Sequence, residues 1–316
     1  MGIIDVVNIK KYFPIKRTAF SRPEWLKAVD GVSFSIKDGK VFSLVGESGS
    51  GKSTVARLVL RLIRPTSGQI LFKGQDINGL RGDSLRKFRK SVQIIFQDPF
   101  ASLNPRMTVF DAVSEPLKVH RIVKKSDLKD KVASLMRNVG LQSDALNRYP
   151  HEFSGGQRQR ICIARALAVS PEVIVADEPL SALDVSIQAQ ILNILSELQK
   201  RTNISFLFIS HDLRVVEYFS DEVAVMYLGK IVEYSKTREL FSNPLHPYTI
   251  ELLSSAPKLR LDTTGKTVPR GDVPSPVDIP PGCPFHPRCP RKSDSCKRIA
   301  PELQEISGRL VACFTK

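Results

Sequence analysis

The sequence predicts an α/β protein with a smaller extension at its C-terminal end, and two observations carry this prediction. Up to about residue 235, short apolar and β-branched runs alternate with helical patterns, which is typical of a layered α/β fold. Beyond that point lie most of the prolines and four of the five cysteines. We therefore expect a domain over residues 1–235 and an extension over residues 236–316.

Four apolar runs are expected to form buried strands, because they are short, rich in β-branched residues and bounded by turn residues. These runs are residues 41–45, 91–96, 173–177 and 204–210. The stretch from residue 98 to about 165 is mainly helical in pattern, with helical apolar spacing over 128–139. We expect a helical subdomain inserted there.

Composition limits the classes of function. The apolar run over residues 204–209 falls far short of the roughly 20 residues that cross a bilayer. The N-terminal residues lack a signal-peptide pattern, and Val6 stands where a myristoylation site has Ser or Thr. We therefore expect a cytoplasmic protein. The formal charge of +15 indicates an anionic partner, which could be a nucleotide, a nucleic acid or the acidic face of a membrane.

A phosphate-binding loop follows the first of these strands. Residues 46–53 read GESGSGKS, the pattern G-x-x-x-x-G-K-[ST], between a predicted strand and a predicted helix over 53–63. Its glycines allow backbone N–H groups to surround phosphate oxygens, Lys52 should reach the β and γ phosphates, and Ser53 should bind Mg²⁺. The context argues against a simple glycine-rich turn. The residues expected to bind nucleotide here are Gly46, Ser48, Gly49, Ser50, Gly51, Lys52, Ser53 and Thr54.

A second candidate site lies at the end of the strand over 173–177, where two carboxylates, Asp177 and Glu178, follow each other. Open α/β sheets place ligand groups at the carboxyl ends of their strands. Asp177 would support Mg²⁺, and Glu178 would act as the general base that polarises the attacking water. An ordinary polar cap after a buried strand is the alternative.

Ser154, Gly155, Gly156 and Gln157, followed by Arg-Gln-Arg, resemble the signature motif of ABC ATPases. The resemblance implies a RecA-like P-loop core in which this segment binds the ATP held by the opposite subunit of a dimer. A Ser-Gly-Gly segment also opens a helix and exposes N–H groups, so a plain helix cap is the alternative. The order of all the motifs favours the ABC interpretation.

Other segments resemble the remaining motifs of that family and imply roles for single residues. Gln97 would contact the metal or the water and communicate with membrane subunits, Asp184 would bridge the dimer, and His211 would sense the γ-phosphate. A histidine after a strand is otherwise more often structural. Phe13, with Tyr12 as second choice, would stack on adenine, although an edge-strand core aromatic is the alternative.

Three stretches look like oligopeptide or dipeptide permease ATPases: residues 96–105, residues 246–249 and the cysteine-rich end. Residues 11–14 and 104–106 look like the F-type ATPase subunit of such systems. The resemblance implies an ATP-hydrolysing importer subunit, peripheral on the cytoplasmic membrane face. Its partners would be a related ATPase in a heterodimer, two transmembrane permease subunits that dock beside Gln97 and, indirectly, an extracytoplasmic solute-binding protein.

One alternative function and two alternative classes of cargo remain to be weighed. A soluble ABC ATPase acting on nucleic acid or ribosomes is the alternative function, but two cassettes in one chain or a long coiled coil would favour it and neither occurs. We therefore expect no nucleic-acid partner. Oligosaccharides and metal chelates are the alternative cargoes.

Four cysteines of the extension form a candidate metal site: Cys283, Cys289, Cys296 and Cys313, separated by 5, 6 and 16 residues. Zinc sites usually pair cysteines two to four residues apart, whereas an iron–sulfur cluster accepts thiolates from separate loops. The spacing and the family resemblance therefore favour a structural [4Fe–4S] cluster, with zinc as the alternative. The cysteines would staple a segment with little apolar content, and we expect ATP binding to survive their loss largely intact.

Overall fold

A computed structural model describes residues 2–15, 24–255 and 274–314. The chain divides into two compact units. The first unit comprises Met1–Lys37, Val41–Asn78 and Ser210–Lys316, and the second comprises Asp38–Lys40 and Gly79–Ile209. The extension thus belongs to the same unit as the predicted phosphate loop. The domain boundaries expected from composition stay a prediction.

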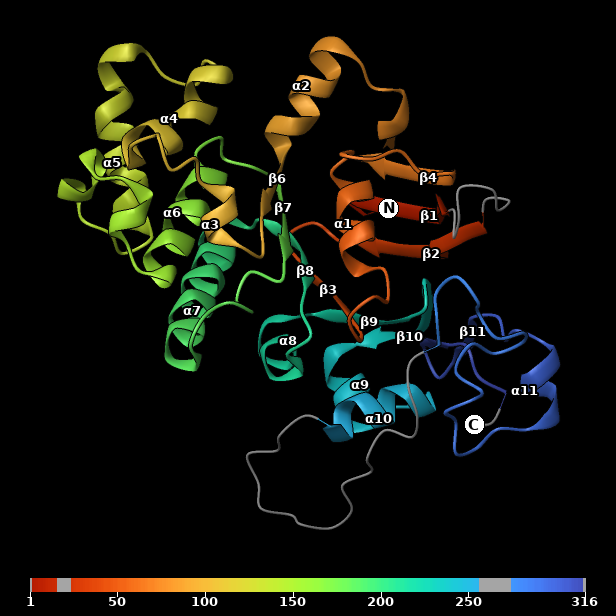
Figure 1. Cartoon of the computed structure of the whole chain (residues 1–316). Helices are drawn as coiled ribbons and strands as arrows, with labels where there is room; N and C mark the ends of the chain where they lie inside the picture. The colour runs from red at the N-terminus through yellow and green to blue at the C-terminus, as the bar shows by residue number, and fades with distance from the viewer. Residues whose placement is uncertain (1, 16–23, 256–273, 315–316) are drawn as a thin grey trace. The chain divides into compact units, whose positions relative to one another are not determined.

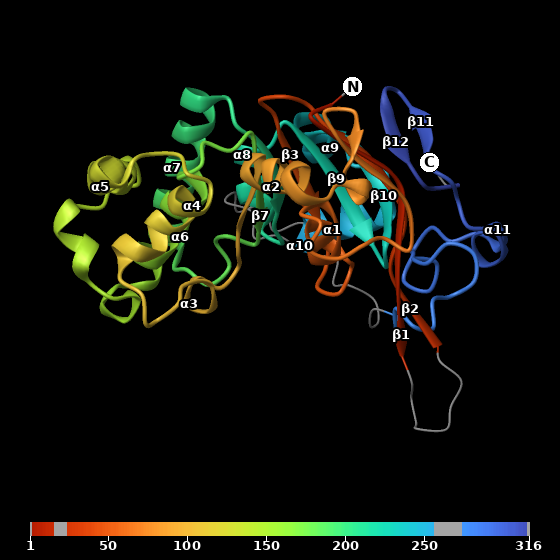
Figure 2. The same cartoon turned by 90° about the horizontal axis from the view of Figure 1, so that it is seen from above.

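The first unit contains an antiparallel sheet with the strand order β2-β1-β4-β5. Its strands are β1 (Ile4–Ile15), β2 (Glu24–Ile36), β4 (Ser67–Phe72) and β5 (Gln75–Asp76). Ile4, Val6 and Ile9 of β1 are buried, and the pairing of β1 with β2 shifts between Val6 and Ile9. Asn8 lies in that bulge with a φ of 46°, a conformation that asparagine tolerates better than most residues. Figure 2 shows β1 and β2 side by side.

The other strands of this unit follow the order β11-β12-β10-β9-β3. They are β3 (Val41–Val45), β9 (Glu222–Tyr227), β10 (Lys230–Lys236), β11 (Gln304–Ile306) and β12 (Arg309–Val311). β3 runs parallel to β9 and is buried along its whole length, as its continuous apolar run predicts. β12 pairs with β10, so the extension adds strands to this sheet (Figure 1).

Short helices complete the first unit. They are α1 (Lys52–Val59), α8 (Leu213–Phe219), α9 (Thr237–Ser242), α10 (Pro247–Ser255) and α11 (Asp294–Arg298). The 3-10 helix η1 (Ile77–Gly79) begins in this unit, and its last residue belongs to the second. In the described part of the extension, the large apolar side chains that are fully buried are few, namely Leu240, Tyr248, Phe285 and Val311. The extension is therefore held mainly by contacts with the rest of its unit.

The second unit has a parallel arrangement of β8 (Ser205–Ile209), β7 (Val173–Asp177) and β6 (Val92–Ile95). β7 has the bounds that the sequence predicts, and β6 and β8 lie within the predicted runs. In this register Asp177 pairs with Ile209 at the carboxyl ends of two neighbouring strands. The predicted acidic pair therefore stands at the edge where such sheets hold ligands.

Helices make up most of the remaining second unit. They are α2 (Gly82–Ser91), α3 (Pro99–Ser102), α4 (Val109–Val119), α5 (Leu128–Asn138), α6 (Gly155–Leu167) and α7 (Val185–Thr202), with the 3-10 helices η2 (Lys125–Asp127), η3 (Ser143–Asn147) and η4 (Pro150–Glu152). Figure 2 shows α4, α5 and α6 packed together. Val113 and Leu117 of α4 and Val132 and Met136 of α5 are fully buried at i, i+4 spacing, as amphipathic helices require. The helical insert is thus present. Among the described residues, none of the helices could cross a bilayer.

Candidate nucleotide site

The predicted phosphate loop connects β3 to α1 in the first unit. Gly46 and Gly51 have φ values of 149° and 105°, a region that side-chain-bearing residues rarely adopt. A Cβ atom at Gly46 would collide with the Met226 carbonyl oxygen, and one at Gly51 with the Ala28 carbonyl oxygen. These glycines are therefore needed both for the turn and for its close packing on neighbouring strands.

Lys52 begins α1 and is only 4% exposed. Its ammonium donates to the carbonyl oxygens of Gly46 and Glu47 at 2.7 and 2.9 Å, and to Ser50 Oγ at 3.4 Å. The cation therefore lies within the loop and stabilises its curvature from inside. Ser53 and Thr54 follow in the first turn of α1, where the helix dipole favours an anion.

Gln97 and Glu178 meet in the second unit. Gln97 Nε2 donates to Glu178 Oε2 at 3.1 Å, which orients the carboxylate that we expect to act as base. Glu178 follows Asp177, the last residue of β7, and has a φ of 49°. Such a conformation strains a non-glycine residue and is often found at functional positions. The Glu178 N–H donates to the Ile209 carbonyl at 2.9 Å, which helps to hold this turn.

The predicted signature segment opens α6, with Ser154 as its N-cap. The Gln157 N–H donates to Ser154 Oγ at 3.4 Å, and the Ser154 N–H donates to Gln157 Oε1 at 3.0 Å. This reciprocal pair is a capping box, so the helix-capping role considered above is realised. Ser154 and Gln157 are exposed. The segment can therefore both begin the helix and present its N-terminus to a ligand.

Comparison with known proteins decides the family. The family described as "ABC transporter" matches residues 29–181, and "Oligopeptide/dipeptide transporter, C-terminal region" matches residues 232–296. The "Oligopeptide transport ATP-binding protein AppF" of Bacillus subtilis is 53% identical, over 98% of this chain and 96% of that protein. This chain is an ABC transporter ATP-binding protein. It belongs with the oligopeptide and dipeptide members of that family and is an ATP hydrolase coupled to transport.

Further relatives of this ABC ATPase agree. The "Dipeptide transport ATP-binding protein DppF" of Escherichia coli is 45% identical, over 99% of this chain and 94% of that protein. Among solved structures, the "Dimeric structure of a post-hydrolysis state of the ATP-binding cassette MJ0796 bound to ADP and Pi" is 28% identical with a TM-score of 0.67. It covers 74% of this chain, which in turn covers 99% of that chain. The predicted RecA-like P-loop fold is confirmed.

Two further predicted residues of the ABC ATPase lie at element ends. Asp184 is the N-cap of α7 in the second unit and is exposed. His211, also exposed, lies in the first unit just before α8. Their roles at the dimer interface and at the γ-phosphate stay predictions.

The two candidate adenine-stacking residues are neighbours on β1. Tyr12 donates its hydroxyl to Asp30 Oδ1 at 2.5 Å, and burial together with that carboxylate raises the pKa of Tyr12 to about 12. Phe13 is half-buried, with Lys11 Nζ 5.0 Å from its ring centroid. Tyr12 is thus already engaged through its hydroxyl. The preference for Phe13 stays a prediction.

The four predicted cysteine ligands line one small cavity in the first unit, together with His246, His286 and Phe285. Cys289 and Cys296 are buried, and burial raises the pKa of the Cys283 thiol to about 11 and that of Cys289 as well. The Cys283 N–H donates to the Cys296 carbonyl at 2.8 Å. In the described part of the chain, no three His, Cys, Asp or Glu residues have an arrangement that could hold a metal ion. The four thiols line the same cavity without forming a metal-binding arrangement, so the cluster predicted from the sequence is not supported by the geometry.

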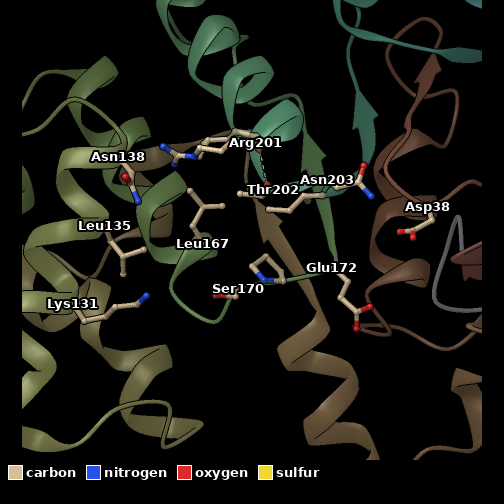
Figure 3. Close-up of a pocket in the computed structure, with 13 residues that line it drawn as sticks. Asp38, Lys131, Leu135, Asn138, Leu167, Ser170, Glu172, Arg201, Thr202 and Asn203 are labelled. Atoms are coloured by element: carbon tan, nitrogen blue, oxygen red, sulfur yellow. Dashed lines mark hydrogen bonds between the residues drawn. The ribbon is translucent and has the colours of Figure 1, made fainter.

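A separate hollow of about 430 Å³ lies in the second unit, and it contains none of the predicted site residues (Figure 3). Lys131 and Leu135 come from α5, Arg201 comes from α7, and Glu172 precedes β7. The hollow is therefore at the amino ends of β7 and β8, opposite the end that carries Asp177 and Glu178. Strand polarity assigns nucleotide to the other end.

Sequence reasoning missed the residues that hold the phosphate loop from the C-terminal part of the chain. Arg288 forms an ion pair with Glu47, the second residue of the loop, and the Tyr248 hydroxyl accepts from the Glu47 N–H. Both partners are more than 200 positions away in sequence. Only the fold brings them together, so no local pattern could have indicated them.

Proposed function

We propose that this chain energises the import of oligopeptides or dipeptides from the cytoplasmic face of a membrane. The observation that carries this proposal is that the likeness to peptide-transport ATP-binding proteins extends over 98% of the chain, including the extension. A generic ABC ATPase would be expected to match only through its core. Oligosaccharides or metal chelates would be the cargo if the permease partners differ.

In this proposal the phosphate loop binds ATP through its backbone N–H groups and Lys52. Ser53, Gln97 and Asp177 would provide oxygen ligands of the kind that Mg²⁺ prefers, and the ion would neutralise phosphate charge when bound. Glu178, oriented by the Gln97 amide, accepts the proton of the attacking water. His211 senses the γ-phosphate, and Phe13 stacks on adenine.

The exposed signature segment, Ser154 to Gln157, would bind the ATP held by a partner subunit, so the chain is expected to work as part of a dimer. We propose a heterodimer with a related ATPase, docked on two permease subunits, with an extracytoplasmic solute-binding protein acting indirectly. Phe96 and Phe100, which flank Gln97 in sequence, are 40% and 61% exposed. Exposed aromatics of this kind suit a protein interface and support docking at this position.

We further propose that Cys283, Cys289, Cys296 and Cys313 hold a structural [4Fe–4S] cluster, with zinc as the alternative. Their convergence on one cavity supports a shared ligand. Thiols bind metal as thiolates, which positive charge nearby stabilises. The cluster would staple an extension that has few apolar side chains of its own, and no step of ATP hydrolysis needs its electrons.

The assembled transporter provides the test. The complex of this chain with its permease subunits and partner ATPase is reconstituted in vesicles, and ATP turnover is measured with peptide and solute-binding protein present. Turnover should rise with peptide and be unaffected by RNA. Stimulation by RNA without permease subunits would instead favour the nucleic-acid alternative. Isolation of the complex should yield two different ATPase chains, and an active complex with two copies of this chain would reject the heterodimer.

A further inference from the structure

We propose that Arg288 of the extension is a positioning residue of the nucleotide site, which acts through Glu47 of the phosphate loop. It would set the geometry of the Gly46–Glu47 peptide and thereby the affinity for ATP. This inference rests on the proposed use of the loop for ATP. It assigns the extension a part in nucleotide binding rather than a purely structural one.

The side chain of Arg288 is 3% exposed and contacts two carboxylates. Its Nη1 donates to Glu47 Oε2 at 2.9 Å and its Nη2 to Glu47 Oε1 at 3.1 Å, which is the bidentate geometry of a strong arginine–carboxylate pair. Nη2 also donates to Glu251 Oε1 of α10 at 2.5 Å. One buried cation therefore joins two parts of the extension, α10 and the segment around Arg288, to the phosphate loop.

Two hydrogen bonds also fix the peptide group between Gly46 and Glu47. Its N–H donates to Tyr248 Oη at 2.9 Å, and the carbonyl of the same peptide group, that of Gly46, accepts from Lys52 Nζ at 2.7 Å. Both polar ends of this peptide are thus occupied, and the plane of the peptide is set. Because N–H groups of the loop must point at phosphate oxygens, a rotation of this peptide would change the cradle.

An aromatic cluster supports these contacts. Tyr248 is fully buried, with its ring centroid 4.6 Å from that of Tyr227 and 5.5 Å from that of Phe285. Phe285 stands three residues before Arg288 in a hydrogen-bonded turn, and its carbonyl accepts from the Arg288 N–H at 3.1 Å. The guanidinium carbon of Arg288 lies 5.7 Å from the ring centroid of Phe285, so the two side chains pack together. This turn lies between Cys283 and Cys289, so the packing of the cysteines bears on Arg288.

The charges show why Arg288 matters more than a surface arginine. Without it, the carboxylates of Glu47 and Glu251 would face each other with no cation between them. The side chain of Glu251 is 10% exposed and that of Glu47 is 30% exposed, so Glu47 would turn toward solvent and Glu251 would stay. Removing one partner of a buried ion pair is generally costly for this reason. The loop would lose its anchor at the residue after Gly46.

The test measures ATP affinity of the full-length chain by displacement of a fluorescent ATP analogue. Arg288→Gln should weaken binding on the order of tenfold, since it removes a buried charged contact to the loop. Arg298→Gln is the control, because Arg298 is exposed at the end of α11 in the same extension and its loss removes the same charge. The control should bind ATP as the wild type does.

A double-variant cycle separates positioning from general stability. If Arg288 acts through Glu47, then Arg288→Gln should cause little further loss in a Glu47→Gln background. Equal losses in both backgrounds would overturn the inference, as would wild-type affinity in a folded Arg288→Gln protein. Tyr248→Phe, which deletes only the hydroxyl, provides a second route if Arg288→Gln does not fold. If Arg288→Gln does not fold, wild-type ATP affinity in both Tyr248→Phe and Glu47→Gln would overturn the inference that Glu47 positions the loop. Absence of ATP binding by the wild type would instead reject the proposed function.

Discussion

The phosphate loop and the cysteine-rich extension are both poor in regular structure, yet they are held in place by opposite means. The loop is shaped locally, since the glycines at 46 and 51 and the buried Lys52 define its curve within a few residues of sequence. The extension is shaped by distant partners: β12 pairs with β10, and Arg288 forms an ion pair with Glu47. A short motif can therefore predict the first region, whereas only the fold shows the second.

The largest effect should come from Glu178→Gln, which keeps the shape and the contact with Gln97 but removes the base. ATP turnover by the assembled transporter should fall about 10²- to 10⁴-fold, the range typical of a general base, while ATP stays bound. Glu172→Gln is the matched control, because Glu172 stands at the other end of β7. Near wild-type turnover in Glu178→Gln would show that this carboxylate is not the base.

Lys52→Ala should act on binding, because it removes the cation inside the loop. We expect ATP affinity to fall roughly 10- to 100-fold, as losing a charge-assisted contact to phosphate implies. Arg57→Ala removes an exposed charge later on the same helix and should bind ATP normally. Titration of both variants with a fluorescent ATP analogue makes the comparison. If Lys52→Ala and Arg57→Ala bound ATP with equal affinity, Lys52 would stabilise the shape of the loop without contacting the nucleotide.

Cys289→Ser tests whether the two regions are independent. The sequence alone predicts that loss of the cysteine site leaves ATP binding largely intact. Because Arg288 adjoins Cys289 and holds Glu47, we now expect ATP affinity to fall by about three- to tenfold as the extension loosens. Cys162→Ala, which removes a buried thiol from α6 in the other unit, should leave affinity unchanged.

The metal content of the same proteins decides between cluster and zinc. Anaerobically purified wild type and Cys162→Ala should be brown, with about four irons and four acid-labile sulfides per chain, as expected for a [4Fe–4S] cluster. Cys289→Ser should be colourless. Stoichiometric zinc in a colourless wild type would replace the cluster by a zinc site, and a metal-free wild type would reject both.

The parts that sequence predicted well share one physical property, which is that their signal is local. β3 and β7 are continuous apolar runs, α5 shows helical apolar spacing, and Ser154 precedes its helix as an N-cap. The strained backbone of Glu178 and the Gln97–Glu178 hydrogen bond could not be predicted, because they depend on the pairing of β6, β7 and β8. The pairing of Arg288 with Glu47 joins residues 241 positions apart, which no pattern in a single sequence encodes.

The smallest effect concerns adenine stacking, where a local signal left two neighbours to choose from. If Phe13 stacks on adenine, Phe13→Leu should weaken ATP binding about two- to tenfold, in line with the roughly 0.5–1.5 kcal/mol of an aromatic pair. Tyr12→Phe keeps the ring and removes only the hydroxyl that donates to Asp30, so it should bind ATP nearly as the wild type does. Tyr12→Leu completes the set. Loss of affinity in Tyr12→Leu together with normal affinity in Phe13→Leu would transfer the role to Tyr12. GTP provides a comparison within the same variant, because an aromatic ring can stack on any base. If Phe13 only stacks, Phe13→Leu should lower the affinities for ATP and GTP by similar factors. A larger loss for ATP than for GTP would indicate a contact specific to adenine.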